Sequence, residues 1–298
     1  MSRCSRASKK RRDWTGCPGI DRGTGAPAGP GHHTHTHLNL HDRDLHGDGV
    51  PDADGLLALA ADVGVTKVVQ IGCDVEYARH SVAMARTRPD VIVGVSVHPN
   101  DAARIHERDG QQALDAALAE IAVLAREDVV RAVGETGLDY FRTDESLHLV
   151  QQRAFRWHID LANELDKTLV IHDRDSHEDV MAVLLEQGPP TRVVFHCFSG
   201  DAAMAARCAE QGWFMSFAGP ITYKANDGLR AALAIVPEEL LLVETDAPYL
   251  TPVPHRGKPN ASYLMPHTVR FMAAQRGIEV EAMCRLLYDN AQRAFGTW

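Results

Sequence analysis

Short apolar segments of strand length alternate with longer segments in which apolar residues recur every three or four positions, from residue 32 onward. The short segments predict strands buried along their whole length, and the longer ones predict amphipathic helices. The predicted strands are Thr34–Leu40, Lys67–Gly72, Val91–Pro99, Val129–Glu135, Thr168–His172, Arg192–His196, Trp213–Ala218 and Leu240–Asp246. The predicted helices are Asp52–Val63, Val75–Arg88, Gln111–Arg126, Glu145–Leu165, His177–Gln187, Ala202–Gln211, Asn226–Ile235, Tyr263–Arg276 and Val280–Phe295.

Regular alternation of strand and helix favours a parallel sheet whose faces are covered by helices. Eight such units in about 265 residues are typical of a (β/α)8 TIM barrel. We therefore expect residues 32–298 to form one α/β barrel domain. A doubly wound open sheet is the alternative, but the Gly-rich phosphate turns that such sheets carry, GxGxxG and the P-loop, do not occur in the chain.

Residues 1–31 have a different composition, rich in Gly, Pro, Ser and Arg and without apolar periodicity. Such a segment cannot bury enough surface to fold, so we predict a disordered basic extension with seven Lys/Arg against two Asp. The pair Arg11–Arg12 is not followed by an apolar stretch, which argues against an export signal. A tail that contacts nucleic acid and an inert tail are both compatible with this composition.

Composition narrows the class of protein. The chain has 298 residues, 45% of them apolar, which is enough for a substantial core. No uncharged apolar stretch approaches the roughly 20 residues of a membrane span, and the six cysteines show no CxxC pattern. We therefore expect a cytoplasmic protein without a membrane segment. The net charge of −9 argues against non-specific coating of nucleic acid, but it allows an enzyme that binds a phosphodiester through metal ions.

Metal-ligand residue types stand at the ends of the predicted strands, where barrel enzymes place their chemistry. These residues are His35, His37, Glu135, His172, His196 and Asp246. Each of them alone is more often a rim residue or a helix cap. Because chance agreement at six designated positions is improbable, the set as a whole predicts a metal site.

Strand geometry predicts how these side chains would share two cations. Residues i and i+2 of a strand face the same side, so His35 and His37 can hold one ion. The two oxygens of Glu135 can bridge both ions, and the remaining two histidines would hold the second. Asp246 can bind the first ion and accept a proton from the attacking water. Imidazole and carboxylate ligands suit Zn²⁺, Mn²⁺, Ni²⁺ or Mg²⁺ without choosing between them.

Seven motifs follow one another along the chain: HTHLN, GETGLDYFR, IHDRDS, FHCFSG, SFAGPITYK, ETDAPYLTP and HRGKPN. Through them residues 33–295 resemble the TatD family of metal-dependent deoxyribonucleases, which have amidohydrolase-like barrels. The resemblance implies a hydrolase of ester bonds that acts on DNA as a 3'-5' exonuclease, with no obligate protein partner. It implies the same six metal ligands: His35, His37, Glu135, His172, His196 and Asp246.

The chain departs from the family pattern in three places. Gly31, His32, His33 and Thr34 precede HTHLN where the family has apolar residues and an Asp, so we expect a short first strand. The third strand ends in VSVHPND, where the family more often has a Gly before its His-Pro. The basic extension has no counterpart in the family.

Further residues are candidates for contact with substrate, namely Arg174, Arg256, Lys224 and His98. The arginines can clamp phosphate oxygens with a planar guanidinium, although Arg174 is flanked by aspartates that could pair with it. Lys224 has the same two interpretations, and His98 either lines the pocket or is a hydrogen-bonded rim residue. Cys197 follows a ligand directly, so we expect it to point away from the barrel axis and pack in the core.

Other functions of the same scaffold are alternatives. Many barrel hydrolases of amides, lactones and phosphotriesters bridge their metals with a carbamylated Lys on the fourth strand, where this chain has Glu135. Hydrolysis of an ester or aminoacyl bond on tRNA would use a similar attack by water. A non-catalytic module that binds metal or nucleic acid through the His-rich segment His32–His46 is another alternative. The complete ligand set with a carboxylate base favours catalysis.

Overall fold

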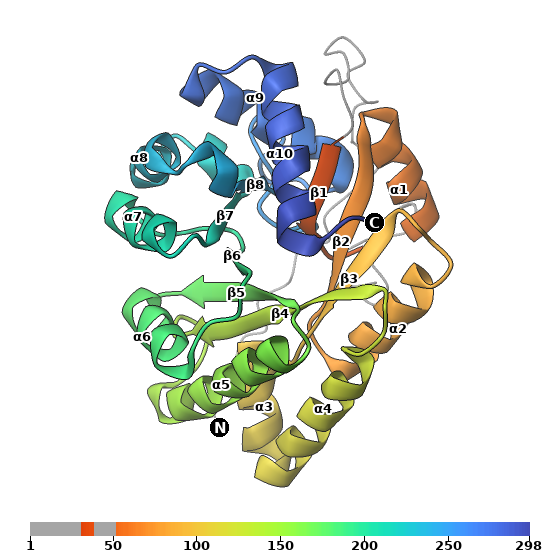
Figure 1. The fold of residues 1–298 in the computed structure, drawn as a ribbon, viewed down its shortest axis with the longest axis vertical. Coiled ribbons are helices and arrows are strands. Elements are labelled where there is room, and N and C mark those ends of the chain that lie inside the picture. The colour runs from red at the N-terminus through yellow and green to blue at the C-terminus, as the bar shows by residue number, and fades with distance from the viewer. Residues whose placement is uncertain (1–30, 39–51) are drawn as a thin grey trace, which may run out of the picture.

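The computed structural model describes residues 31–38 and 52–298, so the predicted extension 1–31 lies outside the described residues except for Gly31. Eight parallel strands follow one another around the sheet in the order of the sequence (Figure 1). They are β1 (Gly31–Thr36), β2 (Val65–Gly72), β3 (Val91–Val95), β4 (Val130–Asp139), β5 (Thr168–Arg174), β6 (Val193–Phe195), β7 (Phe214–Phe217) and β8 (Leu241–Val243).

Helices connect successive strands and cover the outside of the sheet (Figure 1). They are α1 (Ala53–Asp62), α2 (Val75–Ala85), α3 (Pro99–Asp109), α4 (Gln111–Leu124), α5 (His148–Glu164), α6 (His177–Gln187), α7 (Ala202–Glu210), α8 (Asp227–Ile235), α9 (Met265–Arg276) and α10 (Val280–Phe295). In the described ranges none of the helices is long and apolar enough to cross a membrane. The arrangement confirms the predicted (β/α)8 TIM barrel.

The nearly closed barrel is joined at its first and last strands by backbone hydrogen bonds at and beyond the strand ends. The backbone N–H of His37 donates to the carbonyl of Ala247 at 3.0 Å, and the N–H of Asp246 donates to the carbonyl of His35 at 3.3 Å. Helix α10 contacts both β1 and β8 and covers this seam. Predicted ligands from opposite ends of the folded chain are therefore joined through backbone hydrogen bonds.

The core explains why the strands are apolar along their length. β3 and β7 are buried at every residue, because helices cover one side of each strand and the barrel interior covers the other. Phe155 of α5 and Phe217 of β7 are among the largest fully buried side chains. The packed interior holds the strand ends, and hence the predicted ligands, in fixed positions.

Several predicted boundaries were wrong near the strand ends. β1 spans Gly31–Thr36, so it begins before the predicted start at Thr34 and ends before His37, while residues 39 and 40 of the predicted strand lie outside the described residues. Its pairing with β2 has two register shifts, consistent with the poor apolar start of this strand. β6 and β8 end at Phe195 and Val243. His196 and Asp246 therefore follow their strands instead of ending them.

Helix α3 was not predicted from the sequence. The strand expected to run to Pro99 ends at Val95, and the helix begins at Pro99. Proline suits the first helical turn because its missing N–H has no partner there. His98 caps the same turn, since its Nδ1 accepts a hydrogen bond from the N–H of Asn100 at 3.1 Å.

Candidate metal centre

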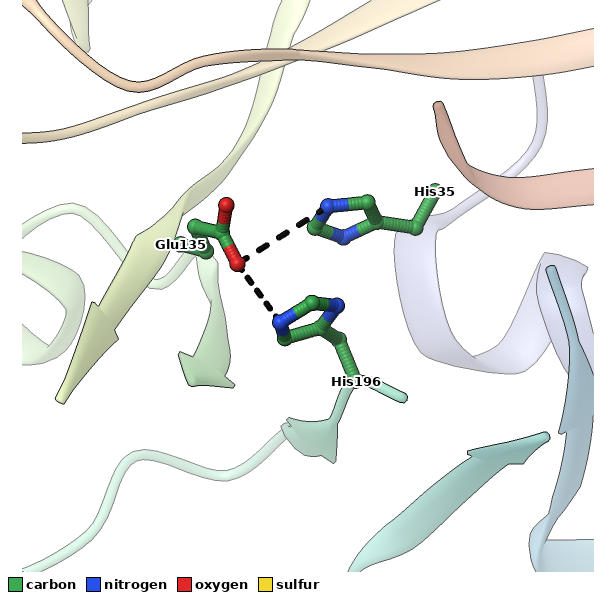
Figure 2. A group of neighbouring side chains, drawn as sticks. All are labelled: His35, Glu135 and His196. Carbon is green, nitrogen blue, oxygen red and sulfur yellow. Dashed lines mark ion pairs between the residues drawn. The ribbon is translucent and has the colours of Figure 1, made fainter. Parts of the chain in front are cut away.

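The barrel brings the six predicted ligand side chains together at the carboxyl ends of its strands, and Figure 2 shows three of them. His35 lies in β1 and His37 just beyond it, while Glu135 lies in β4 and His172 in β5. The remaining two lie beyond their strands: His196 is the first residue after β6 and Asp246 is the third residue after β8. Six residues that are far apart in the sequence thus converge on one place.

Glu135 lies at the centre of this cluster. Its Oε2 lies 2.5 Å from Nε2 of His196, 3.3 Å from Nδ1 of His172 and 3.9 Å from Nε2 of His35, as Figure 2 shows for the first and the last of these. Its Oε1 faces Nε2 of His37 at 3.6 Å. The two oxygens of one carboxylate therefore face different groups of imidazoles.

A local irregularity of β4 aims Glu135 at the cluster. Gly134 pairs with Val170 and Thr136 pairs with Ile171, so Glu135 is an extra residue in β4 relative to β5. Such a bulge re-aims a side chain out of the regular alternation. Gly134 adopts φ +146°, and a Cβ at this position would overlap the carbonyl of Val170. Only glycine fits there, which explains the first glycine of the GETG motif.

Asp246 forms a second group of donors with His35 and His37. Its Oδ1 lies 3.5 Å from Nε2 of His37 and 3.8 Å from Nε2 of His35, and the two Nε2 atoms are 3.3 Å apart. Two N or O donors bound to one tetrahedral cation are separated by roughly 3.3 to 3.6 Å, given bond lengths of about 2.0 to 2.2 Å. The spacing of this group fits a shared divalent cation.

Two of the histidines are hydrogen-bonded to buried carboxylates, and these carboxylates were not identified from the sequence. Nε2 of His172 donates to Asp139 Oδ2 at 3.3 Å, and Nδ1 of His196 donates to Glu244 Oε1 at 3.2 Å. Asp139 is 1% exposed and Glu244 is 0% exposed. Carboxylates in this position fix the ring orientation of metal-binding histidines and raise their basicity. The signal was present, because both residues stand inside the GETGLDYFR and ETDAPYLTP motifs.

The charges of the cluster are coupled. Burial disfavours the ionised form of Glu135, but the imidazoles of His196 and His172 outweigh it and hold the pKa of Glu135 well below its usual value. Burial likewise disfavours the charged form of His196, yet Glu135 and Glu244 raise its pKa well above the ordinary value. Each of these two groups thus favours the charged form of the other across their 2.5 Å contact, and a divalent cation could take the place of the proton between them.

His98 also reaches the cluster, with Nε2 at 4.0 Å from Glu135 Oε1. Burial, together with the nearby His172, lowers the pKa of His98 to about 3. The ring is neutral at physiological pH, and because Nδ1 accepts from Asn100, Nε2 must carry the proton. His98 can thus donate a hydrogen bond to an oxygen in the site.

A cleft of about 840 Å³ opens over the cluster, and its lining includes His98, Arg174 and Arg142. The guanidinium carbon of Arg174 lies 4.0 Å from the centre of the Phe141 ring, which holds it at the cleft. Arg256 and Lys224 are exposed and are not among the lining residues of this cleft. Arg256 instead lies over the Tyr223 ring, 4.3 Å from its centre.

The expectation that Cys197 packs away from the site was wrong. Cys197 lines the cleft, and its N–H donates to Glu244 Oε1 at 2.9 Å. β6 ends at Phe195 and Cys197 has φ +42°. The alternation of a strand therefore does not apply to this residue.

Comparison with known proteins gives consistent results. The family described as TatD related DNase matches residues 33–296. A protein of Mycobacterium tuberculosis named "Uncharacterized metal-dependent hydrolase TatD" is 42% identical over 269 residues, which are 88% of this chain and 96% of that protein. A protein of Musicola paradisiaca named "3'-5' ssDNA/RNA exonuclease TatD" is 33% identical over 252 residues, 82% of this chain and 92% of that protein. The crystal structure of the TatD homologue YjjV of Escherichia coli matches 90% of this chain and 98% of its own, with a TM-score of 0.79 and 26% identity.

Proposed function

The chain belongs to the TatD related DNase family of metal-dependent hydrolases, and from this premise we propose that it cleaves phosphodiester bonds of DNA as a 3'-5' exonuclease. One observation carries the proposal: imidazoles converge on both oxygens of the buried Glu135, at a cleft that two arginines also line. The relative named a 3'-5' ssDNA/RNA exonuclease supports nucleic acid as the substrate.

We assign two divalent ions to the cluster. His35, His37 and Asp246 would hold the first together with Glu135, which would also contribute to the second. His172 and His196 would complete that second site, because both face Glu135 Oε2. When bound, such ions lower the pKa of water and offset the negative charge of phosphate oxygens.

Asp246 is assigned as the general base. Its Oδ1 faces His35 and His37, and the same carboxylate lines the cleft. In this proposal the other oxygen would accept the proton of the water that attacks phosphorus.

Cationic and hydrogen-bonding side chains would bind the scissile phosphate. Arg174, fixed on Phe141, can offer two parallel N–H groups to phosphate oxygens. His98 would donate its Nε2 proton in a hydrogen bond near the leaving group, as a neutral ring. Arg256 and Lys224 lie outside the cleft lining, so we assign them to nucleotides further along a bound strand.

Parallel assays test the proposed reaction and its rivals. Purified, metal-replete protein is incubated with single- and double-stranded DNA labelled at either end, with RNA, with a phosphotriester and with an aminoacyl-tRNA. We expect stepwise shortening of 5'-labelled single strands and early release of mononucleotide from 3'-labelled ones. Activity only on the phosphotriester or the aminoacyl-tRNA would overturn the assignment to DNA.

Removal of metal is the second test. Protein treated with EDTA should lose activity and regain it with added divalent ion, and the ion that restores the rate identifies the working metal. Hydrolysis insensitive to EDTA would count against every metal mechanism. We also propose the cytoplasm as the compartment, since a reducing environment preserves the thiol of Cys197 at the cleft.

A further inference from the structure

A cysteine that none of the proposed steps uses lies against the metal cluster. Cys73 directly follows β2 and is half-buried. Its Sγ lies 3.2 Å from Glu135 Oε1, to which the thiol donates, and 4.0 Å from Nδ1 of His37. This thiol is therefore on the Oε1 side of Glu135, opposite His172 and His196.

The spacing is that of atoms that can share a cation. Ligand atoms of His37, Cys73 and Glu135 all lie within 4.8 Å of one another, and Glu135 Oε1 is 3.6 Å from His37 Nε2. A sulfur at about 2.3 Å and an oxygen or nitrogen at about 2.0 Å from a tetrahedral zinc are roughly 3.5 Å apart. The sulfur-to-oxygen distance of 3.2 Å is close to this value.

We propose that Cys73 is a further metal ligand, which binds as a thiolate the ion that His37 and Glu135 hold. The inference rests on the proposed metal site and adds a soft donor to a set of imidazoles and carboxylates. Sulfur ligands select Zn²⁺ and other thiophilic ions over Mg²⁺. The thiol proton, now directed at Glu135, leaves to the solvent when the sulfur binds the cation. Cys73 thus favours zinc as the ion that His37 and Glu135 hold.

Two substitutions separate this role from a simple hydrogen bond. Cys73→Ser keeps a donor to Glu135 but removes the soft sulfur, and Cys73→Ala removes both. If the thiol served only to position Glu135, the Ser variant would behave as the wild type. Cys197→Ser is the matched control, because Cys197 is also half-buried beside the cluster but belongs to none of the possible ligand groups in the described residues.

Cobalt substitution provides a readout that is independent of DNA cleavage. Full-length, metal-stripped protein is titrated with Co²⁺, which gives a thiolate-to-metal charge-transfer absorption in the near ultraviolet only when sulfur is bound. We expect this band in the wild type and in Cys197→Ser, and its loss in both Cys73 variants. Absence of the band from the wild type, or its persistence in Cys73→Ser, would overturn the proposal.

Metal affinity and thiol reactivity complete the test. Competition with a chelator should show a loss of zinc affinity of tenfold or more in Cys73→Ser, with little change for Mg²⁺; equal zinc affinities would contradict the proposal. In the wild type, zinc should slow alkylation of Cys73 by iodoacetamide, followed by mass spectrometry, and an unchanged rate would count against it. This measurement decides the matter if the variants fail to fold. Since no readout uses DNA, a failure of the nuclease proposal leaves the test of Cys73 intact.

Discussion

The two halves of the metal cluster differ in what holds their histidines. His172 and His196 each donate to a buried carboxylate, Asp139 and Glu244. His37 instead donates from Nδ1 to the backbone carbonyl of Ile71 at 3.1 Å. A carboxylate orients the ring and also adds negative charge, whereas a peptide carbonyl only orients it. The difference predicts that the ion between His172 and His196 binds more tightly than the ion beside His37.

The half of the cluster with His35, His37 and Asp246 has a different role, which the solvent exposure of Asp246 supports. Asp246 lines the cleft and its side chain is 15% exposed, against 0% for Glu244. A base must reach solvent and substrate, while a residue that supports a ligand has to be kept dry. We infer that the half with His35 and His37 performs proton transfer and that the other half anchors the site.

The largest expected effect tests this division directly. Asp246→Asn should lower kcat for DNA cleavage by about 10² to 10⁴-fold, because the amide cannot accept the proton. The metal content, measured by mass spectrometry after equilibration, should stay near that of the wild type. Retained turnover would remove Asp246 from the role of base.

The next effect concerns the anchoring half. Asp139→Asn should weaken binding of one of two metal equivalents by about 10 to 100-fold, since His172 loses its charged partner. Calorimetric titration of metal-stripped protein resolves the two equivalents. Glu178→Gln, on the exposed surface of α6, is the matched control and should change neither. An equal loss of affinity for both ions would contradict the distinction between the two halves of the cluster.

His158 is a buried histidine outside the cluster, and it lacks the carboxylate partner that His172 and His196 have. His158 accepts from the N–H of Val97 and donates to the carbonyl of Ala154, and burial lowers its pKa to about 4. The unfolded chain takes up the proton near pH 6.5, so the folded state loses stability as the pH falls from 6.5 towards 4. Between pH 7 and pH 5 the loss should be about 2 kcal/mol, given 1.36 kcal/mol per pKa unit.

Urea unfolding at the two pH values measures this loss. In His158→Gln the difference between pH 7 and pH 5 should shrink by most of that amount, although the variant is less stable at both. His80, exposed on α2, supplies the control variant His80→Gln, which should keep the wild-type dependence. An unchanged difference in His158→Gln would show that the proton is taken up elsewhere.

The smallest expected effect lies at the cleft wall. Arg174→Ala should raise KM for DNA by about fivefold with little change in kcat, which corresponds to roughly 1 kcal/mol of lost binding. Steady-state kinetics with a labelled single strand measures both constants. Arg207→Ala, a surface arginine that pairs with Glu178, is the control. An unchanged KM would contradict the proposal that Arg174 binds a phosphate of the substrate.

The sequence predicted which side chains gather near the carboxyl ends of the strands, although not the exact strand boundaries, because parallel strands align these ends at one face of a barrel. The approximate positions of His35, Glu135 and His172 followed from apolar runs that stop at a polar residue. The bulge at Glu135 did not follow, because it depends on the register between β4 and β5. Apolar periodicity carries no information about that pairing.

The residues behind the ligands were hidden for another reason. The motifs GETGLDYFR and ETDAPYLTP contain Asp139 and Glu244, but only the folded barrel shows that each of them contacts a histidine that lies far away in the sequence. Cys73 looked like an isolated thiol, since β2 and β4 are separated by β3. Contacts across the barrel interior leave no local pattern in the sequence.

The backbone bonds that close the barrel between His35, His37 and the residues after β8 have a consequence for biosynthesis. The candidate centre takes donors from both sides of this seam, so it cannot assemble until Ala247 has emerged from the ribosome. A nascent or prematurely terminated product that lacks the residues after β8 therefore also lacks Asp246 and the partner that His37 has at the seam.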